Sequence, residues 1–207
     1  MPSSSEDRSG PAPSGLTLHG APRSRASMPR WYLEERAIPY HWHELDLKAG
    51  EHRQPPFLAI NPFAKVPALT DHGFRGPDGG PLHLFENGAI LLHLAENHGG
   101  DFADPVERSL AIQWVLFANS TLSIALFVPS NQEREFPALM TRLDALLEPD
   151  RPLVGDRWGV ADCSVLSHLA YLPLFFPDLD LSPYPSVQAC IAATRARPAH
   201  QRVMGAR

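Results

Sequence analysis

The chain has 207 residues, and its 18 basic and 23 acidic side chains give a net charge of −5. It has no basic block, so we do not expect a nucleic acid as a partner. With 43% hydrophobic and 20% charged residues, its composition is ordinary for a soluble globular protein. No apolar run approaches the roughly 20 residues of a membrane span, so no membrane is expected either. The length allows one large or two small domains.

Two features bear on the compartment. Residues 1–15 are rich in Ser, Pro and Gly and lack the apolar core of a secretory signal, so we expect a disordered tail. Cys163 and Cys190 form no CxxC pair and have no metal-ligand spacing. This pattern is typical of a reducing cytosol and excludes a redox dithiol near the N-terminus. We therefore expect a cytoplasmic protein and no metal.

The first half of the chain predicts the element order βαβ-α-ββα, which is that of a thioredoxin-like domain. A strand, a helix and a strand within about 30 residues form a βαβ unit, so the first two strands should be parallel. The turn-rich stretch 71–81 should join the last two strands as an antiparallel hairpin. The expected strands are 16–19, 40–47, 66–70 and 82–85, and the expected helices run from Ser24 or Ser27 to about 37, from 54 to 60 and from 87 to about 97.

Beyond a break at residues 98–101, the pattern is helical throughout. Asp104 and Pro105 give a strong helix start, because an acidic N-cap is followed by proline at the first helical position. Pro129 and Pro173 are expected to end helices. The expected helices are 104–127, 133–147, 160–172 and 186–195. We assign residues 16–98 to the α/β domain, 99–106 to a linker and 107–207 to an all-helical domain.

The stretch 61–69 poses a local conflict. Val66, Ala68 and Leu69 are typical of a short buried strand, yet Pro67 lies within it and cannot donate a ladder hydrogen bond. One interpretation is a cis Val66-Pro67 peptide that turns the main chain of Val66 outward, where it could pair with a ligand's peptide groups. The alternative is an edge strand with a trans proline. The residues alone leave both open.

A second stretch, residues 84–94, runs from an apolar strand end through Glu86 and Asn87 into a helix. Asn87 is a good N-cap, and the first-turn N–H groups of this helix have no partner within the helix. Such a turn can hold a carboxylate on backbone amides while Glu86 faces an ammonium group.

Together the two stretches resemble the glutathione transferase family, whose first domain carries N-P-x-G-K-V-P-x-L followed by E-S-x-A-I. The resemblance extends from about residue 16 to residue 198. It implies a thioredoxin-like domain followed by an all-α domain, glutathione as co-substrate and a homodimer. Within the family, the chain looks most like the chi class described from cyanobacteria. At the start of the helix at 160, Gly159 stands where the family usually has Ser or Thr.

The resemblance also implies roles in glutathione binding. Glu86 would take the ammonium group and Asn87 the adjacent carboxylate, where the family mostly has Ser. The main chain of Val66, before Pro67, would pair with the cysteinyl backbone. Two cations would neutralise the glycine carboxylate: His52, in a motif similar to the G-Q-H of theta-like members, and Lys65.

The family activates the sulfur with a Tyr, Ser or Cys just after the first strand, and this chain has no Tyr or Cys there. We take Ser24 as the hydroxyl donor to the thiolate and Arg23 as the alternative, since a cation would lower the sulfur pKa. Arg25 is expected to make a structural ion pair instead. The electrophile pocket would be lined by residues that could equally belong to the helical core: Trp114, Phe117 and Asn119.

The leading hypothesis is a glutathione transferase that conjugates the glutathione thiolate to small hydrophobic electrophiles in detoxification. A second is glutathione-dependent reduction of peroxides or disulfides. A third is a non-catalytic glutathione-binding or scaffold protein, since a fold does not fix a function.

Overall fold

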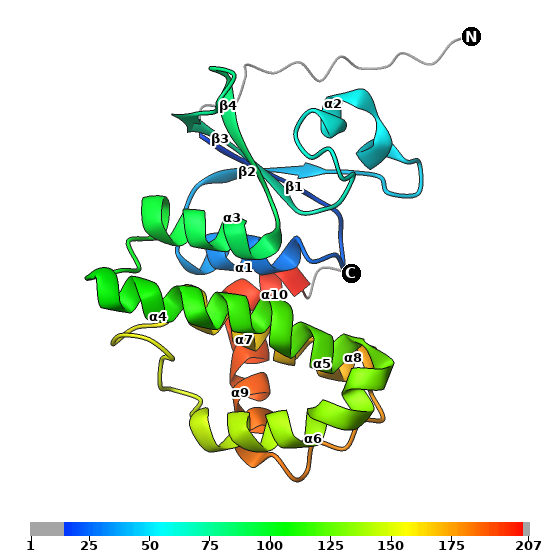
Figure 1. Ribbon diagram of the computed structural model, residues 1–207, viewed down its shortest axis with the longest axis vertical. Helices are drawn as coiled ribbons and strands as arrows, with labels where there is room; N and C mark the ends of the chain where they lie inside the picture. Colours follow the sequence, from blue (N-terminus) through cyan, green and yellow to red (C-terminus); the bar gives the residue numbers. More distant parts are fainter. Residues whose placement is uncertain (1–14, 205–207) are drawn as a thin grey trace.

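The structure is a computed structural model that describes residues 15–204. All but the last residue of the expected tail 1–15 lies outside this range. Within it, a four-stranded sheet with α2 lies at one end of the molecule, α1 and α3 form a middle layer, and further helices form the other end (Figure 1).

The sheet is mixed, with strand order β2-β1-β3-β4. β1 runs parallel to β2, as the sequence predicted. β3 runs antiparallel to β1, which the sequence analysis did not address, and antiparallel to β4, as it predicted. The βαβ crossover gives the first relation, and the turn around Gly79 gives the last. The strands are β1 (Leu16–Gly20), β2 (Tyr40–Glu44), β3 (Ala68–Arg75) and β4 (Pro81–Phe85).

The helices of the α/β part lie on both faces of the sheet (Figure 1). Residues from the sheet, such as Leu18 and Leu69, share a core with Trp31 of α1, Ile90 of α3 and Val115 of α4. The middle layer is therefore buried on both sides. The elements are α1 (Ser27–Glu35), η1 (Glu51–Arg53), α2 (Pro55–Leu58), α3 (Asn87–Leu94) and a π-helical extension, η2 (Ala95–Gly99).

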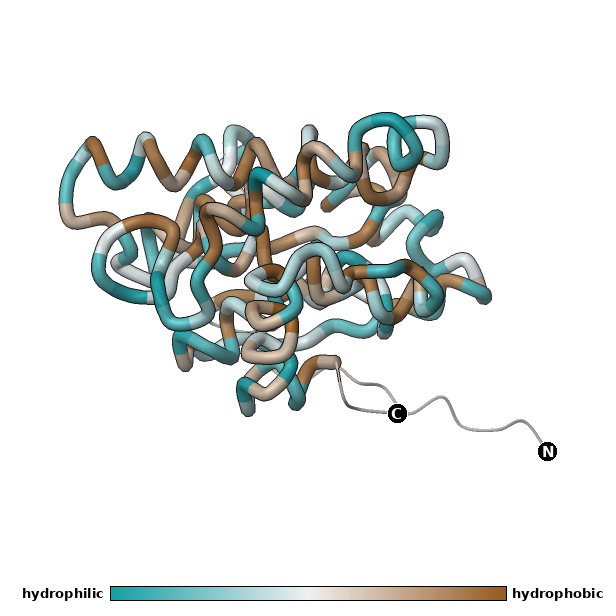
Figure 2. Tube along the Cα trace, turned by 90° about the horizontal axis from the view of Figure 1, so that it is seen from below, coloured by the Kyte–Doolittle hydropathy of each residue, from teal (hydrophilic) through white to brown (hydrophobic). Residues whose placement is uncertain are grey.

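The second part is all helical, as predicted. Hydrophobic and hydrophilic stretches alternate along its helices (Figure 2), which is the pattern of amphipathic helices around a shared core. α10 returns to pack against α1 of the first part. The helices are α4 (Pro105–Leu116), π-helical η3 (Phe117–Leu122), α5 (Ser123–Phe127), α6 (Pro129–Leu146), α7 (Val160–Ala170), α8 (Leu172–Phe175), α9 (Pro185–Ala196) and α10 (Pro198–Met204).

Several expected boundaries were wrong, mostly at prolines. β3 begins at Ala68, so Pro67 precedes the strand and removes no ladder hydrogen bond. Pro173 does not end helical structure, since it lies in the first turn of α8. Pro198 begins α10, which the sequence analysis missed. The first turn of a helix tolerates proline because its N–H groups have no partner within the helix.

α4, η3 and α5 form one continuous helix, Pro105–Phe127, of 23 residues. It is long and apolar enough to cross a membrane by length and composition, which the sequence analysis did not expect. A core helix passes the same test. Here Val115, Leu122 and Leu126 are fully buried in the two cores of the fold.

The start of α7 is stabilised from a distance. Asp162 accepts a hydrogen bond from the Gly159 N–H at 2.9 Å, which is half of a capping box. Asp101 satisfies another donor of this first turn, since its carboxylate accepts the Val160 N–H at 2.7 Å. Asp101 also lies 3.2 Å from Arg36, so one side chain joins α1 to α7.

Candidate functional site

A groove of about 230 Å³ lies where the loop before β3 meets the start of α3. It brings together five of the residues predicted from the sequence: Lys65, Val66, Pro67, Glu86 and Asn87. The remaining lining residues were not predicted: Arg25, Asn61, Phe63 and Phe85.

The loop wall of the groove is fixed by Asn61, which is 1% exposed. Its side chain donates to the Lys65 carbonyl at 2.7 Å and accepts the Phe63 N–H at 3.1 Å. The Val66-Pro67 peptide is cis. Within residues 15–204, no hydrogen bond involves the Val66 main chain, because the strand pairing starts two residues later. Its N–H and C=O are therefore available to a ligand.

The opposite wall is the first turn of α3. Glu86, not Asn87, occupies the N-cap position. It is exposed and adopts φ 70° and ψ 122° without a side-chain cap bond, a conformation unfavourable for a residue with a Cβ. The N–H groups of the first turn that follows have no partner within the helix and carry its positive dipole end.

Asn87 is only 4% exposed. Its amide nitrogen lies 2.7 Å from Met28 Sδ and 3.4 Å from Asn119 Oδ1, whereas its Oδ1 has no partner in the described part of the chain. The Asn87 side chain thus ties the start of α3 to α1 and to the long helix, and its main chain contributes to the groove.

Two cations face the groove. Lys65 and Arg25 are exposed lining residues, and neither joins any of the ion pairs found between residues 15 and 204. The structural ion pair expected for Arg25 is therefore absent. With Glu86, the groove carries two positive charges and one negative charge. Arg25 could have been predicted as a groove residue from its position just before the first helix.

The two candidates for sulfur activation lie in the turn before α1, outside the groove lining. Ser24 is half-buried, and its hydroxyl donates to the Ala21 carbonyl at 2.7 Å and accepts the Ala26 N–H at 3.2 Å. To donate to a sulfur, this hydroxyl must leave the Ala21 carbonyl. Arg23 is exposed, with φ 57°.

The other predicted residues lie elsewhere. His52, in η1, accepts a hydrogen bond from Arg53 Nε at 3.2 Å and does not line the groove. Trp114 and Phe117 contact each other edge to face, with centroids 5.5 Å apart, and pack against the helical core. Of the three electrophile candidates, Asn119 alone reaches the start of α3.

A second cavity, of about 500 Å³, lies between the start of α4 and the loop before α7. Its charged lining is mainly acidic, with Asp101, Glu107, Asp156 and Asp162 against Arg157. Burial raises the pKa of Asp162 to about 6 despite its backbone hydrogen bonds. Such a lining does not suit an anionic ligand, whereas the groove at α3 does.

A thioredoxin-like part joined to an all-helical part, with an acid at the start of α3, is the architecture of glutathione transferases. The family model for the glutathione S-transferase N-terminal domain matches residues 14–96. A protein of Escherichia coli (strain K12) named disulfide-bond oxidoreductase YfcG is 32% identical over 201 residues, covering 89% of this chain and 92% of that protein. This chain belongs to the glutathione S-transferase family.

Two further similarities bear on function. A glutathione transferase from Burkholderia graminis, solved with two glutathione molecules bound per subunit, is 31% identical with a TM-score of 0.76, covering 95% of this chain and 90% of that one. The transcriptional regulator URE2 of Saccharomyces cerevisiae is 37% identical over 95 residues. That match covers 42% of this chain and 25% of the regulator, so the chain spans about a quarter of that relative.

Proposed function

We propose that the groove binds glutathione and that the protein is a glutathione transferase. The observation that carries this proposal is the match of charges. Glutathione has two carboxylates and one ammonium group at neutral pH, and the groove presents Arg25 and Lys65 opposite Glu86. Each ligand charge thus has a counter-charge, and the Val66 main chain, which makes no hydrogen bond within residues 15–204, lines the same groove.

The proposed pose follows from the walls of the groove. The γ-glutamyl carboxylate accepts hydrogen bonds from the first-turn amides of α3, beginning with the Asn87 N–H, while its ammonium group faces the Glu86 carboxylate. The cysteinyl N–H and C=O pair with the Val66 main chain, as in an added β-strand. Lys65 neutralises the glycine carboxylate, and Arg25 pairs with the γ-glutamyl carboxylate. His52 reaches that carboxylate only if the η1 loop moves toward the groove.

The pose directs the cysteinyl sulfur toward the turn before α1. A free thiol has a pKa of about 8.5, so a donor or a cation must stabilise the thiolate at neutral pH. Ser24 remains the proposed hydroxyl donor, with Arg23 as the alternative. The exposed Arg25 guanidinium is a third candidate, because Arg25 lines the proposed glutathione groove and Arg23 does not.

For the reaction, we propose conjugation to small hydrophobic electrophiles, in detoxification in the cytoplasm. The electrophile would approach over Asn119, with Trp114 and Phe117 contributing from the half-buried edge of the helical core. The two free, buried cysteines support a reducing compartment. Membership of the chi class and a homodimeric assembly complete the proposal, on the resemblance of the motifs.

A second candidate is reduction of disulfides or peroxides with glutathione. It is favoured by the similarity to a protein named as a disulfide-bond oxidoreductase along 92% of its length. A non-catalytic role is the third candidate, on the similarity over 95 residues to a transcriptional regulator.

Two assays separate these candidates. Isothermal titration with glutathione tests the groove: Lys65→Met and Arg25→Met should each weaken binding about tenfold by removing one charge-assisted hydrogen bond of about 1.5 kcal/mol. Arg75→Met, an exposed cation on the hairpin, is the matched control and should change nothing. Glutathione binding that is absent, or equal in all four proteins, would contradict the assignment of the groove.

Activity is then compared on two substrate sets, aryl halides and isothiocyanates against a peroxide and a mixed disulfide. Conjugation that exceeds reduction supports the transferase, and the reverse supports the second candidate. Tight binding with neither activity would leave the non-catalytic role. Ser24→Ala should lower kcat with little change in KM, and a larger loss in Arg23→Ala or Arg25→Ala would move sulfur activation to that cation.

A further inference from the structure

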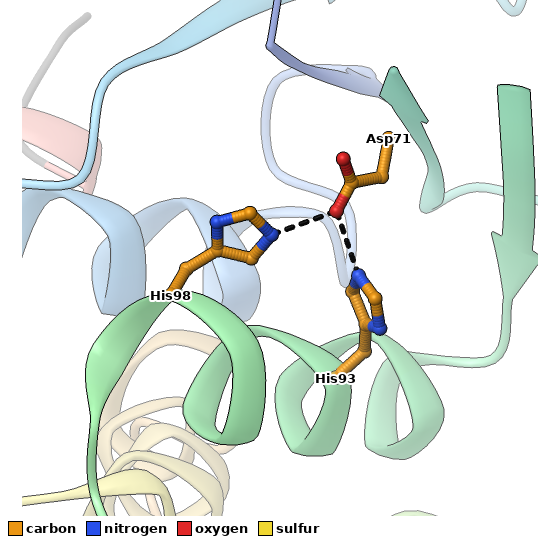
Figure 3. A group of neighbouring side chains, drawn as sticks. All are labelled: Asp71, His93 and His98. Carbon is orange, nitrogen blue, oxygen red and sulfur yellow. Dashed lines mark hydrogen bonds and ion pairs between the residues drawn. The ribbon is translucent and has the colours of Figure 1, made fainter. Parts of the chain in front are cut away.

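Three side chains with metal-ligating atoms converge at the end of α3 that is remote from the groove. Asp71 lies on β3, His93 on the last turn of α3 and His98 on η2 (Figure 3). One ligand atom from each lies within 4.8 Å of the other two, and residues 15–204 contain no other group of three that meets this condition. Neither the groove nor the proposed reaction uses these residues.

The π-helix is what brings the two histidines together. His93 and His98 are five residues apart, and on a regular α-helix they would point about 140° away from each other. The i→i+5 repeat of η2 turns both rings to the same side, toward the sheet (Figure 3). Single π-helical turns are rare because they disrupt the regular i→i+4 hydrogen bonds of the helix. Those that occur are frequently found at functional sites.

The carboxylate is already arranged as a ligand. Asp71 is 1% exposed, and its Oδ1 accepts the Gly73 N–H at 2.8 Å. Its Oδ2 faces both imidazoles, at 2.8 Å from His93 Nε2 and 2.7 Å from His98 Nε2. The carboxylate is thus held in one orientation, with one oxygen directed at both rings.

We propose that Asp71 Oδ2, His93 Nε2 and His98 Nε2 bind a divalent transition-metal ion of the zinc type. Two imidazoles and one carboxylate are a donor set that suits Zn²⁺ and its neighbours, and not Mg²⁺ or Ca²⁺. Metal–ligand bonds of about 2.0–2.1 Å at tetrahedral angles place ligand atoms about 3.3 Å apart. The two nitrogen–oxygen separations need to widen by only about half an ångström.

The surroundings of the three side chains admit an ion from solvent on one side. Phe74 packs edge-on against the rings of His93 and His98, with centroids 5.1 and 6.2 Å away, and so blocks one side of the proposed metal site. The side chain of His98 is 24% exposed, which gives an ion access from solvent. With Nε2 bound to the metal, His93 carries its proton on Nδ1, 3.1 Å from the Asn97 side-chain amide, whose oxygen can accept the Nδ1–H hydrogen bond once the amide is flipped. A bound ion would clamp the β3–β4 hairpin to α3.

The competing explanation is that the two histidines only hydrogen-bond the buried carboxylate and bind nothing. Zinc titration of the full-length, tag-free protein after dialysis against a chelator distinguishes the two. Glutathione is left out because its thiol binds zinc. The variants are His98→Ala, which removes the most exposed ligand, and Asp71→Asn, which removes the anion but keeps an acceptor. His72→Ala, an exposed neighbour of Asp71 in β3, is the matched control.

The wild-type protein should bind one zinc per chain, and Co²⁺ should give the visible absorption of a four-coordinate site. An outer partner of a ligand typically changes affinity about 10–100-fold, so loss of a ligand in His98→Ala should cost at least about 100-fold. His72→Ala should bind as the wild type does. A wild type without stoichiometric zinc binding, or a correctly folded His98→Ala that binds zinc equally well, would overturn the site. If Asp71→Asn does not fold, His98→Ala decides alone, with circular dichroism as its folding check.

Discussion

Glu86 offers a test in which stability and binding should change in opposite directions. Its φ of 70° and ψ of 122° lie in a region that costs a residue with a Cβ about 1–3 kcal/mol. Glycine adopts this region freely but loses about 0.5–1 kcal/mol through its greater freedom in the unfolded chain. Glu86→Gly should therefore raise the free energy of unfolding by about 1 kcal/mol.

The same substitution removes the carboxylate proposed to face the ammonium group of glutathione. A hydrogen bond to a charged group contributes about 1.5–3 kcal/mol, so the Kd for glutathione should rise about 10- to 150-fold. Glu86→Gln is the matched control, because it loses the charge but keeps the Cβ. It should lose affinity and gain no stability.

Urea unfolding followed by circular dichroism measures the first effect, and isothermal titration measures the second. If Glu86→Gly is less stable than the wild-type protein, the strain at this residue is not relieved by glycine and the first part of the reasoning fails. If both variants bind glutathione as the wild type does, Glu86 does not face the ammonium group.

Three further predictions concern the interior. Asp101→Ala should lower the free energy of unfolding by about 1–2 kcal/mol in urea, because the α7 cap on Val160 is lost. Burial lowers the pKa of His168 to about 4, below its value near 6.5 in an unfolded chain. The unfolded state then binds more protons, so the free energy of unfolding should fall as the pH decreases from about 6.5 to about 4. In His168→Gln this fall should be smaller by up to about 3 kcal/mol. Burial raises the pKa of Cys190 to about 11 and that of the fully buried Cys163 well above its usual value, so Ellman's reagent should label neither thiol before unfolding.

Each of these has a clear contrary result. An Asp101→Ala protein as stable as the wild type would show that water replaces the cap. If the stability of His168→Gln falls as steeply below pH 6.5 as that of the wild type, the proton uptake on unfolding belongs to other buried histidines, such as His19 or His200. Rapid labelling of either cysteine in buffer would show that the helical part opens readily.

The parts of the fold that follow local rules could be predicted from the sequence. Asp104 and Pro105 begin α4, and Asp104 accepts the two N–H groups expected of an N-cap. The parallel pairing of β1 with β2 followed from the βαβ connection, and the antiparallel pairing of β3 with β4 followed from the turn-rich stretch between them. Prolines were harder, because Pro173 and Pro198 stop one helix and start the next within a residue or two. The sequence shows the proline, but the packing of the following residues decides whether a new helix begins.

Long-range contacts could not be predicted in this way. The cap that Asp101 provides to Val160 joins residues 59 positions apart, and no local pattern shows it. The same holds for the groove. Its two walls, at Val66 and at Glu86, could be predicted from short motifs. Arg25 was not predicted with them, because it lies in neither motif and reaches the groove from the turn between β1 and α1. Asp71 was passed over because its histidine partners meet only through a π-helical turn.

The central claim is that the groove between Val66 and the start of α3 binds glutathione through hydrogen bonds from the protein's main chain to the main chain of the tripeptide. A crystal structure of the protein with glutathione tests it most directly. We expect the Val66 N–H and C=O to pair with the cysteinyl residue, and the γ-glutamyl carboxylate to lie on the Asn87 N–H. Glutathione bound elsewhere, for example in the cavity between residues 101 and 162, or in the groove without contact to Val66, would contradict the account.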